Sequence, residues 1–431
     1  MGRPLRKERM SAREAAVAVV RQLRDAGHTA YFAGGCVRDA LLGHEPKDYD
    51  VATDATPDQV RTLLPRSRAV GEAFGVVLVY RGGHAIEVAT FRSEWGYTDK
   101  RRPDHVVFTD AEHDAKRRDF TINGLFADPL DADPHTGGDR IIDYVGGRAD
   151  LEAGVVRAIG DPSERFSEDY LRMLRAPRFA ARLNFAIERR TAAAIRPLAK
   201  HLGQISRERI GAEVQAMLTG PRPAAAIRLV HDLRLDGPVL NEDHTDVPLH
   251  TVDALTGDAA PVPYATLLVA WLFNRHVADD LRLARVAAFA SHGALARLRR
   301  WRIALCLSNQ HHDQAKAILT LLPQAERWRE LDVARRKRLL GAPVWPETLR
   351  LLHALPAASE VDELERDAQP LIDEGVAPPP LVDGNDLIQL GLTPGPAFGR
   401  LLDAVYDAQL DGRVRDREQA LAWVREHGRT A

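Results

Sequence analysis

Two aspartates that follow a pair of glycines constrain this chain more than any other feature of its sequence. The glycines are Gly34 and Gly35, and the aspartates are Asp48 and Asp50. Alternate side chains of a β-strand point to the same face, so this spacing predicts that the two carboxylates project together and bind divalent metals. A glycine pair lets the backbone approach a phosphate group closely. The combination predicts transfer of a nucleotide from a triphosphate, with two metals about 4 Å apart at the reacting groups.

The residues around this pattern predict alternating helices and strands. Residues 37–42 are typical of one short helix, capped by Gly43, and Pro46 interrupts the chain before the aspartate strand. A second helix is indicated by residues 56–59, where threonine, proline and glutamine suit an N-cap, a first helical position and a capping box.

A β-hairpin is predicted for residues 76–91, because two apolar runs flank a turn at residues 81–84. If a single sheet forms, the hairpin lies against the strand that carries Asp50. Glu87 on the returning strand would then supply a third carboxylate. Its position alone fits an ordinary exposed strand residue equally well.

A charged segment at residues 96–118 follows the hairpin and has no clear periodicity, which is typical of a functional loop. From about Leu151 onward the pattern is helical almost throughout, with proline-containing breaks. The sequence therefore predicts an α+β head with a small mixed sheet and helices, followed by an all-α neck, body and tail.

The composition narrows the class of protein. A chain of 431 residues suffices for two to four domains, and a net charge of -2 excludes a generally basic nucleic-acid-binding protein. No apolar run reaches about 18 residues, and the basic start lacks the apolar stretch of a secretory signal. The two cysteines, Cys36 and Cys306, form neither a disulfide framework nor a zinc site. We expect a cytoplasmic protein without a membrane segment.

Residues 168–178 predict a helix on which Asp169, Arg172 and Arg175 follow one another at intervals of three. A carboxylate only accepts hydrogen bonds and a guanidinium only donates them, so Asp169 and Arg172 together match the base edges of cytosine and adenine. Uracil and guanine would present a carbonyl to the carboxylate, at a cost of about 1–3 kcal/mol. The same spacing also fits a solvated helix with intrahelical ion pairs. Pro177 is expected to bend this helix or to end its first part.

Taken together, these motifs resemble the class II branch of the polymerase-β-like nucleotidyltransferases, which contains bacterial tRNA CCA-adding enzymes and poly(A) polymerases. The matching stretches keep the family's order within the first 185 residues and are residues 33–39, 47–51, 86–92, 117–123 and 168–179, with a further likeness at 205–210.

The resemblance implies a role for each candidate residue. Asp48 and Asp50 would bind Mg²⁺, and Glu87 would be the third catalytic carboxylate. The residues expected to bind the nucleotide are Gly34, Gly35, Arg38, Arg118, Asp119, Asn123, Asp169, Arg172, Arg175 and Arg178. The family's flexible loop corresponds to residues 96–118 and is complete, which suggests that the terminal A can be added.

The implied activity is template-independent addition of CCA, from CTP and ATP, to the 3′ end of tRNA. Residues 381–387, 391–396 and 409–412 are similar to the tail of CCA-adding enzymes, whereas a tail that only caps the helices would leave specificity open. The alternatives are poly(A) addition, addition of A alone, and an RNA-binding protein on an idle scaffold. No protein partner is indicated.

The resemblance also suggests four regions. Residues 1–150 would be the nucleotidyltransferase head, 151–220 the neck with the base-reading helix, 221–375 the body, and 376–431 a tRNA-binding tail. The body faintly resembles helices of HD phosphohydrolases but lacks the metal-binding pair after residues 271–276. We interpret residues 311–313, with the sequence His-His-Asp, as a surface motif in a non-catalytic region.

Overall fold

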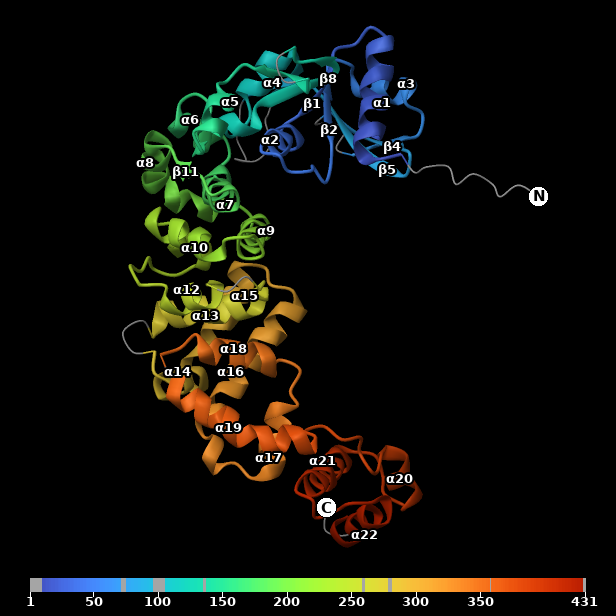
Figure 1. The fold of residues 1–431 in the computed structure, drawn as a ribbon, viewed down its shortest axis with the longest axis vertical. Helices are drawn as coiled ribbons and strands as arrows, with labels where there is room; N and C mark the ends of the chain where they lie inside the picture. The colour runs from blue at the N-terminus through green and yellow to red at the C-terminus, as the bar shows by residue number, and fades with distance from the viewer. Residues whose placement is uncertain are drawn as a thin grey trace, which may run out of the picture. The chain divides into compact units, whose positions relative to one another are not determined.

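The computed structural model describes residues 10–70, 75–95, 105–134, 137–257, 260–277, 281–356 and 358–428. The chain forms two compact units, Met1–His244 and Thr245–Ala431, and each is described by itself. The first unit contains the mixed sheet and a run of helices, and the described part of the second is helical (Figure 1). The predicted α+β head followed by helical regions is confirmed.

Seven strands form the main sheet of the first unit, in the order β3-β4-β5-β2-β1-β8-β9. They are β1 (Ala30–Ala33), β2 (Asp50–Thr53), β3 (Ser67–Ala69), β4 (Val76–Arg81), β5 (His84–Thr90), β8 (Leu125–Ala132) and β9 (Asp139–Asp143). The pair β2–β5 is parallel and the other pairs are antiparallel. Two smaller pairs are β6–β7 (Arg92–Trp95, His105–Phe108) and β10–β11 (Val155–Val156, Ala186–Ile187).

The register of β2 and β5 places the two central carboxylates side by side. Asp50 pairs with Glu87, and two positions later Ala52 pairs with Ala89. Because side chains alternate along a strand, Asp50 projects from the same face as Ala52. That face carries a buried cluster in which Ala52 and Phe126 of the sheet contact helix α4. The hairpin of β4 and β5 and its position beside the Asp50 strand are therefore confirmed.

Helices surround the sheet and continue beyond it in the first unit (Figure 1). The helices are α1 (Ala12–Asp25), α2 (Gly35–Leu41), α3 (Pro57–Leu63), α4 (Ala111–Lys116), η2 (Thr121–Asn123), α5 (Gly147–Glu152), α6 (Pro162–Glu168), α7 (Arg172–Leu183), α8 (Arg189–Leu198), η3 (Ala199–Gln204), α9 (Arg207–Leu218), α10 (Pro223–Asp232) and α11 (Asp236–Leu240). The predicted capping box of α3 is present, with Thr56 and Gln59 as its two members.

Two predictions for the head need correction. Asp48 does not lie on a strand, because β2 begins only at Asp50 and the preceding residues form a bend. The charged segment is not an open loop in its described part, since β7 and α4 occupy most of residues 105–118. Residues 96–104, the rest of the predicted flexible loop, lie outside the described residues.

The predicted helix over residues 168–178 is wrong in its first part. Helix α6 ends at Glu168, and Asp169 adopts an extended conformation with φ -146° and ψ 104°. The Asp169 side chain accepts a hydrogen bond from the Leu171 backbone N–H at 3.0 Å, a local bond that competes with helix continuation. Pro177 lies inside α7, which continues to Leu183, so the break precedes the proline by eight residues.

The second unit consists of helices in its described residues, and none of the described helices is both long and apolar enough to cross a membrane. The helices are α12 (His250–Thr256), α13 (Tyr264–His276), α14 (Leu283–Phe289), η4 (Ala290–Ala294), α15 (Leu295–Ala304), α16 (Asn309–Glu326), η5 (Trp328–Glu330), α17 (Val333–Leu340), α18 (Trp345–His353), α19 (Ala358–Glu374), α20 (Gly384–Gln389), α21 (Pro396–Leu410) and α22 (Arg417–His427).

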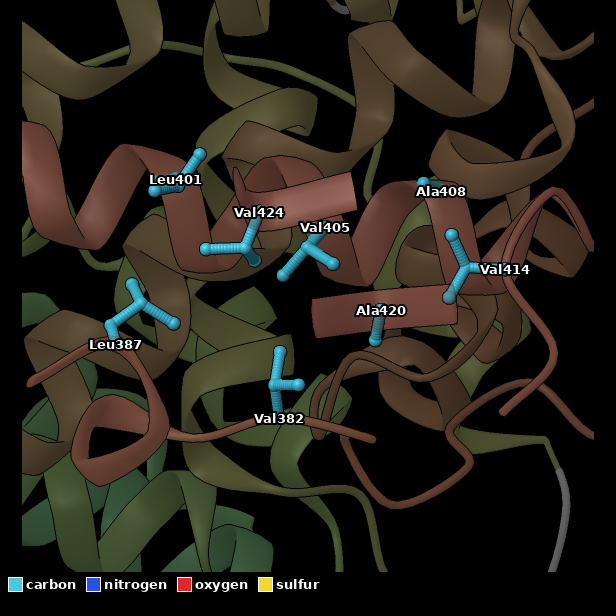
Figure 2. Close-up of a cluster of buried hydrophobic side chains, with 8 residues drawn as sticks. All are labelled: Val382, Leu387, Leu401, Val405, Ala408, Val414, Ala420 and Val424. Carbon is cyan, nitrogen blue, oxygen red and sulfur yellow. The ribbon is translucent and has the colours of Figure 1, made fainter. Parts of the chain in front are cut away.

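A small apolar core joins the last three helices of the second unit. Figure 2 shows its side chains pointing toward one another from the α20, α21 and α22 region. We call it the tail core, and it consists of Val382, Leu387, Leu401, Val405, Ala408, Val414, Ala420 and Val424. Its members on α21 and α22 recur at intervals of three to four residues, which is the spacing of one helix face.

Candidate active site

A cavity of about 540 Å³ lies within the first unit and is lined mainly by charged side chains. We call it the arginine-lined cavity. Its lining residues are Gly34, Gly35, Arg38, Asp50, Arg117, Arg118, Asp119, Asn123, Asp169, Leu171, Arg172, Arg175, Arg178, Phe179, Arg182 and Arg209. Eight arginines face three aspartates, so the lining carries an excess of positive charge. Guanidinium groups bind phosphate oxygens through paired hydrogen bonds, and a polyanion such as a triphosphate suits this charge.

The structure brings eleven of the thirteen predicted site residues to this cavity, all except Asp48 and Glu87. Five lining residues were not predicted: Arg117, Leu171, Phe179, Arg182 and Arg209. Arg182 continues the spacing of Arg175 and Arg178 along α7, so helical periodicity could have found it. Arg209 comes from α9, and no local pattern connects that helix with the cavity.

The turn between β1 and α2 requires glycine at its first position. Gly34 has φ +69°, a positive value that residues other than glycine rarely adopt. A Cβ atom there would also lie 2.8 Å from Nη1 of Arg118. Gly35 begins α2 with no close contact of this kind. Because Gly34 has no side chain, its backbone and the guanidinium group of Arg118 can both line the cavity.

Neighbouring carboxylates alter the acidity of Asp50. Surrounding protein atoms and the charge of Glu87 raise the pKa of Asp50, Arg118 opposes them, and Asp48 adds to the rise, giving a pKa of about 6. The Asp50 side chain still contacts solvent. Mutual repulsion of carboxylates is the condition that a bound divalent cation relieves.

The donor set fits a divalent metal that the substrate helps to bind. Among the described residues, no three side chains of His, Cys, Asp or Glu converge into a complete metal site. Mg²⁺ is commonly held by one or two carboxylates together with substrate phosphates, rather than by a cage of protein groups. Asp50 lines the cavity and carries oxygen atoms suited to this role, and Asp48 lies two residues before it in the chain.

One buried aspartate anchors the two arginines that follow α4. Asp114 is 1% exposed and accepts hydrogen bonds from Arg117 at 2.6 Å and from Arg118 at 2.9 Å. Burial alone would raise the pKa of Asp114, but the two guanidinium groups outweigh it and lower that pKa. Arg118 also donates to the backbone carbonyl of Asn123 at 3.1 Å. Arg118 is thus fixed between α4 and the turn at Gly34.

A second buried aspartate links the head with α7. Asp119 accepts hydrogen bonds from Asn123 at 3.0 Å and from Arg175 at 2.7 Å. Burial would raise the pKa of Asp119, but Arg175 and the hydrogen bonds lower it to about 2. Asn123 in turn accepts a hydrogen bond at 2.6 Å from Arg38, which is 3% exposed. The predicted Asp119 and Asn123 therefore orient arginines of the cavity.

The two residues expected to read the base form separate ion pairs. Asp169 accepts from Arg209 at 2.6 Å, and Arg172 pairs with Glu168. Arg172 also donates to the backbone carbonyls of Arg165 at 2.9 Å and Arg117 at 3.3 Å. Asp169 and Arg172 do not share one helix, but both line the cavity. A base entering there would meet a carboxylate and a guanidinium that protein partners already orient.

The middle residue of the His-His-Asp motif in the second unit is buried, so the motif does not lie wholly at the surface. His312 is 8% exposed on α16, and its Nδ1 lies 3.1 Å from the Asp313 carboxylate. His311 contacts the ring of Tyr264, with centroids 4.9 Å apart. The sequence interpretation was wrong for His312 because it did not consider which face of the helix is buried.

The fold and this charged cavity define a nucleotidyltransferase of the polymerase A type. Residues 30–157 match the family model "Poly A polymerase head domain", and residues 184–242 match "Probable RNA and SrmB- binding site of polymerase A". The CCA-adding enzyme of Geobacillus stearothermophilus is 34% identical over 436 residues, covering 96% of this chain and 97% of that protein. The chain belongs to the family of CCA-adding enzymes.

Other relatives agree with this assignment. The CCA-adding enzyme of Lactiplantibacillus plantarum is 33% identical over 422 residues, which cover 95% of this chain and 94% of that protein. The crystal structure of the Bacillus stearothermophilus CCA-adding enzyme in complex with CTP has a TM-score of 0.67 and 31% identity, covering 97% of this chain and 98% of that one. The Thermotoga maritima CCA-adding enzyme complexed with tRNA, with a TM-score of 0.62 and 21% identity, shares the fold over 97% of this chain and 96% of that one.

Proposed function

We propose that this protein adds the nucleotides C, C and A to the 3′ end of tRNA, using CTP and ATP, without a nucleic-acid template. The observation that carries the proposal is the arginine-lined cavity, where Asp50 and the pair of Asp169 and Arg172 line one space. One cavity thus provides a metal-binding carboxylate, positive charge for a triphosphate, and a donor–acceptor pair for a base. The relatives that match nearly the whole chain are CCA-adding enzymes.

The nucleotide would bind with its phosphates at the glycine turn. The backbone at Gly34 and Gly35 and the guanidinium groups of Arg38 and Arg118 line that part of the cavity. Asp114 and Asn123 hold these two arginines in place, so little side-chain freedom is lost when the triphosphate binds. This supports tight binding of the phosphates irrespective of the base.

In the reaction, the tRNA 3′-hydroxyl attacks the α-phosphate, a new P–O bond forms, and pyrophosphate leaves as the old bond breaks. Asp48 and Asp50 would hold Mg²⁺, which when bound lowers the pKa of the hydroxyl and neutralises the pyrophosphate. Glu87, paired in register with Asp50, places a further negative charge beside that site. The guanidinium groups at the glycine turn stabilise charge on the leaving phosphates.

The choice of CTP and ATP would come from Asp169 and Arg172. The carboxylate accepts from the amino group that cytosine and adenine share, and the guanidinium donates to ring acceptors. Arg209 holds Asp169, and Glu168 with two backbone carbonyls holds Arg172, so both groups are oriented before the base arrives. Arg175 and Arg178 complete the wall on the same helix as Arg172.

We further propose the four regions 1–150, 151–220, 221–375 and 376–431 as head, neck, body and tail, with the last binding tRNA, and a cytoplasmic location. The helical regions would hold tRNA by its backbone and shape, which is how structured RNA is usually recognised.

The experiment that tests the proposal offers the purified protein three tRNA transcripts, ending in the discriminator base, in CC, and in CCA. Each is incubated with Mg²⁺ and one nucleoside triphosphate at a time, and the products are sized. We expect C on the first transcript, a single A on the second, and no extension of the third. Repeated A would indicate poly(A) addition, A on the second transcript alone would indicate an A-adding enzyme, and no extension of any would leave an RNA-binding protein.

A further inference from the structure

One aromatic ring in the wall of the arginine-lined cavity is shared by three guanidinium groups. The Cζ atoms of Arg38, Arg175 and Arg178 lie 5.3, 5.2 and 4.7 Å from the centroid of the Phe179 ring. All three distances are within the range of about 6 Å in which a cation is attracted to an aromatic ring. The ring and all three arginines line the cavity.

The Phe179 ring is itself held in place. Phe179 is 5% exposed, and it meets the fully buried Phe120 edge to face, with centroids 5.9 Å apart and an interplanar angle of 77°. Edge-to-face contact is a favoured arrangement of two aromatic rings and is worth about 0.5–1.5 kcal/mol beyond burial. Phe179 therefore presents a fixed surface to the three arginines.

Carboxylates balance the like charges that gather around the ring. Asp39 accepts a hydrogen bond from Arg38 at 2.6 Å, and Glu213 lies 3.1 Å from Arg178 and 3.8 Å from Arg175. Each guanidinium thus has an anion as one neighbour and the ring as another. Arg38 also donates to Asn123 at 2.6 Å, and Arg175 donates to Asp119 at 2.7 Å. The ring is a further attractive neighbour that these polar contacts do not provide.

The three arginines belong to both ends of the proposed nucleotide site. Arg38 is on α2, beside the glycine turn, whereas Arg175 and Arg178 are on α7, which begins with Arg172. Asp39 and Arg182 join the same two helices at 3.0 Å. The contacts around Phe179 therefore connect the wall expected to bind phosphates with the wall expected to bind the base.

We propose that Phe179 is a positioning residue for both nucleoside triphosphates, and that its ring electrons hold Arg38, Arg175 and Arg178 in the orientation that binds CTP or ATP. The inference rests on the proposed function and adds to it a residue that need not contact the base. Because the same three arginines serve both substrates, loss of the ring should affect CTP and ATP alike and leave the choice of base unchanged.

The simpler interpretation is that Phe179 only fills space, and replacement of the ring by fluorinated rings separates the two. Phenylalanine analogues with one, two and three fluorine atoms at position 179 weaken the negative ring face in steps while changing the volume little. We expect the KM for CTP and for ATP to rise in parallel with each step, reaching about three- to thirtyfold, with a smaller change in kcat. A space-filling residue would give the same KM in all three.

Natural substitutions give a second measurement. Phe179→Leu keeps an apolar side chain and removes the ring, so it should raise both KM values at least as much as the trifluorinated ring, while Phe179→Trp should retain most of the affinity. The matched control is Phe166→Leu in α6, a fully buried phenylalanine whose ring has no guanidinium group over it among the described residues. It should lower the unfolding temperature without raising either KM.

The outcomes separate this inference from the proposed function. If the unmodified protein adds neither C nor A to tRNA, the proposed function fails. If it adds both, but the KM values do not follow fluorination, the positioning role of Phe179 is overturned while the function stands. A change in KM for only one of the two triphosphates would also overturn it.

Discussion

The arginine-lined cavity consists mainly of charged side chains, whereas the tail core consists of aliphatic ones. In the cavity, buried or half-buried arginines are each held by carboxylates, carbonyls or an aromatic ring, as Arg38, Arg118 and Arg175 illustrate. In the tail core, aliphatic side chains such as Leu387 and Val424 belong to one buried apolar cluster (Figure 2). A charged network specifies where a few groups lie, whereas an apolar cluster mainly provides stability. A single substitution in the cavity should therefore mainly change the reaction rate or substrate binding. A single substitution in the tail core should mainly lower stability.

The largest effect is expected from Asp50→Ala. It should lower the incorporation of both C and A by roughly 1,000-fold or more, because one metal site serves every step. The unfolding temperature should be unchanged or slightly higher, since burial and then the neighbouring carboxylates already disfavour the charge on Asp50. Single-turnover incorporation and a thermal melt measure the two quantities, and Asp48→Ala should behave in the same way. Turnover near that of the unmodified protein in either variant would remove the metal assignment.

Leu387→Ala makes the opposite test in the tail core. Leu387 is fully buried, so truncation should reduce the stability of this region by about 2–5 kcal/mol. Hydrogen exchange of α20, α21 and α22 should accelerate. Binding of CTP should not change, because every residue lining the cavity belongs to the first unit. The contrast between the regions would be lost if this variant weakened CTP binding as much as it accelerated exchange in the tail.

Asp169→Ala should relax the choice of base with a smaller effect on stability. Without the carboxylate, UTP and GTP no longer face an acceptor opposite their carbonyl, so discrimination should fall by up to about 3 kcal/mol. Competition between CTP and UTP in single-turnover reactions measures this difference. The control is Glu164→Ala, which removes an exposed acidic side chain nearby on α6. If the Asp169 variant excluded UTP and GTP as strictly as before, the base would be selected elsewhere.

The smallest expected effect is the contribution of one cavity residue, Asp119, to the pH dependence of stability. The pKa of Asp119 is about 2 in the folded protein, below the value of about 3.9 of an aspartate in an unfolded chain. A lowered folded pKa stabilises the fold above the unfolded pKa, so this contribution, about 2 kcal/mol, is present above pH 4 and is lost as the pH falls toward 2. Unfolding at a series of pH values should show it, and Asp119→Asn should make that dependence shallower between pH 4 and 2. An equal slope in both proteins would show that Asp119 does not cause it.

The sequence predicted which residues meet at the cavity better than it predicted the local backbone around them. Turn and strand signals placed Gly34, Asp50 and Glu87 on the correct elements, because local backbone preferences determine those elements. The break at Asp169 was missed, since one side-chain hydrogen bond to the backbone at Leu171 decides it. The periodic pattern around it favours a continuous helix, and periodicity does not report such a bond.

Partners that are distant in the chain were the other limit of prediction. Arg209 and Glu213 lie on α9, yet they pair with Asp169 and Arg178 across the cavity wall. Similarly, the sequence indicates only that Phe179 is an apolar residue of a helix, and its contacts with three arginines are seen only in the structure. Tertiary packing alone brings these groups together, so no local pattern contains them.

The parallel pairing of β2 and β5 has a consequence for how the protein matures. Asp50 and Glu87 are neighbours through this pairing, although α3, β3 and β4 lie between their strands in the chain. Such long-range pairing is among the slower events of folding, because distant parts of the chain must meet before any contact stabilises them. The two carboxylates therefore come together only when β2 and β5 pair, so completion of this part of the sheet and assembly of the carboxylate pair are one step.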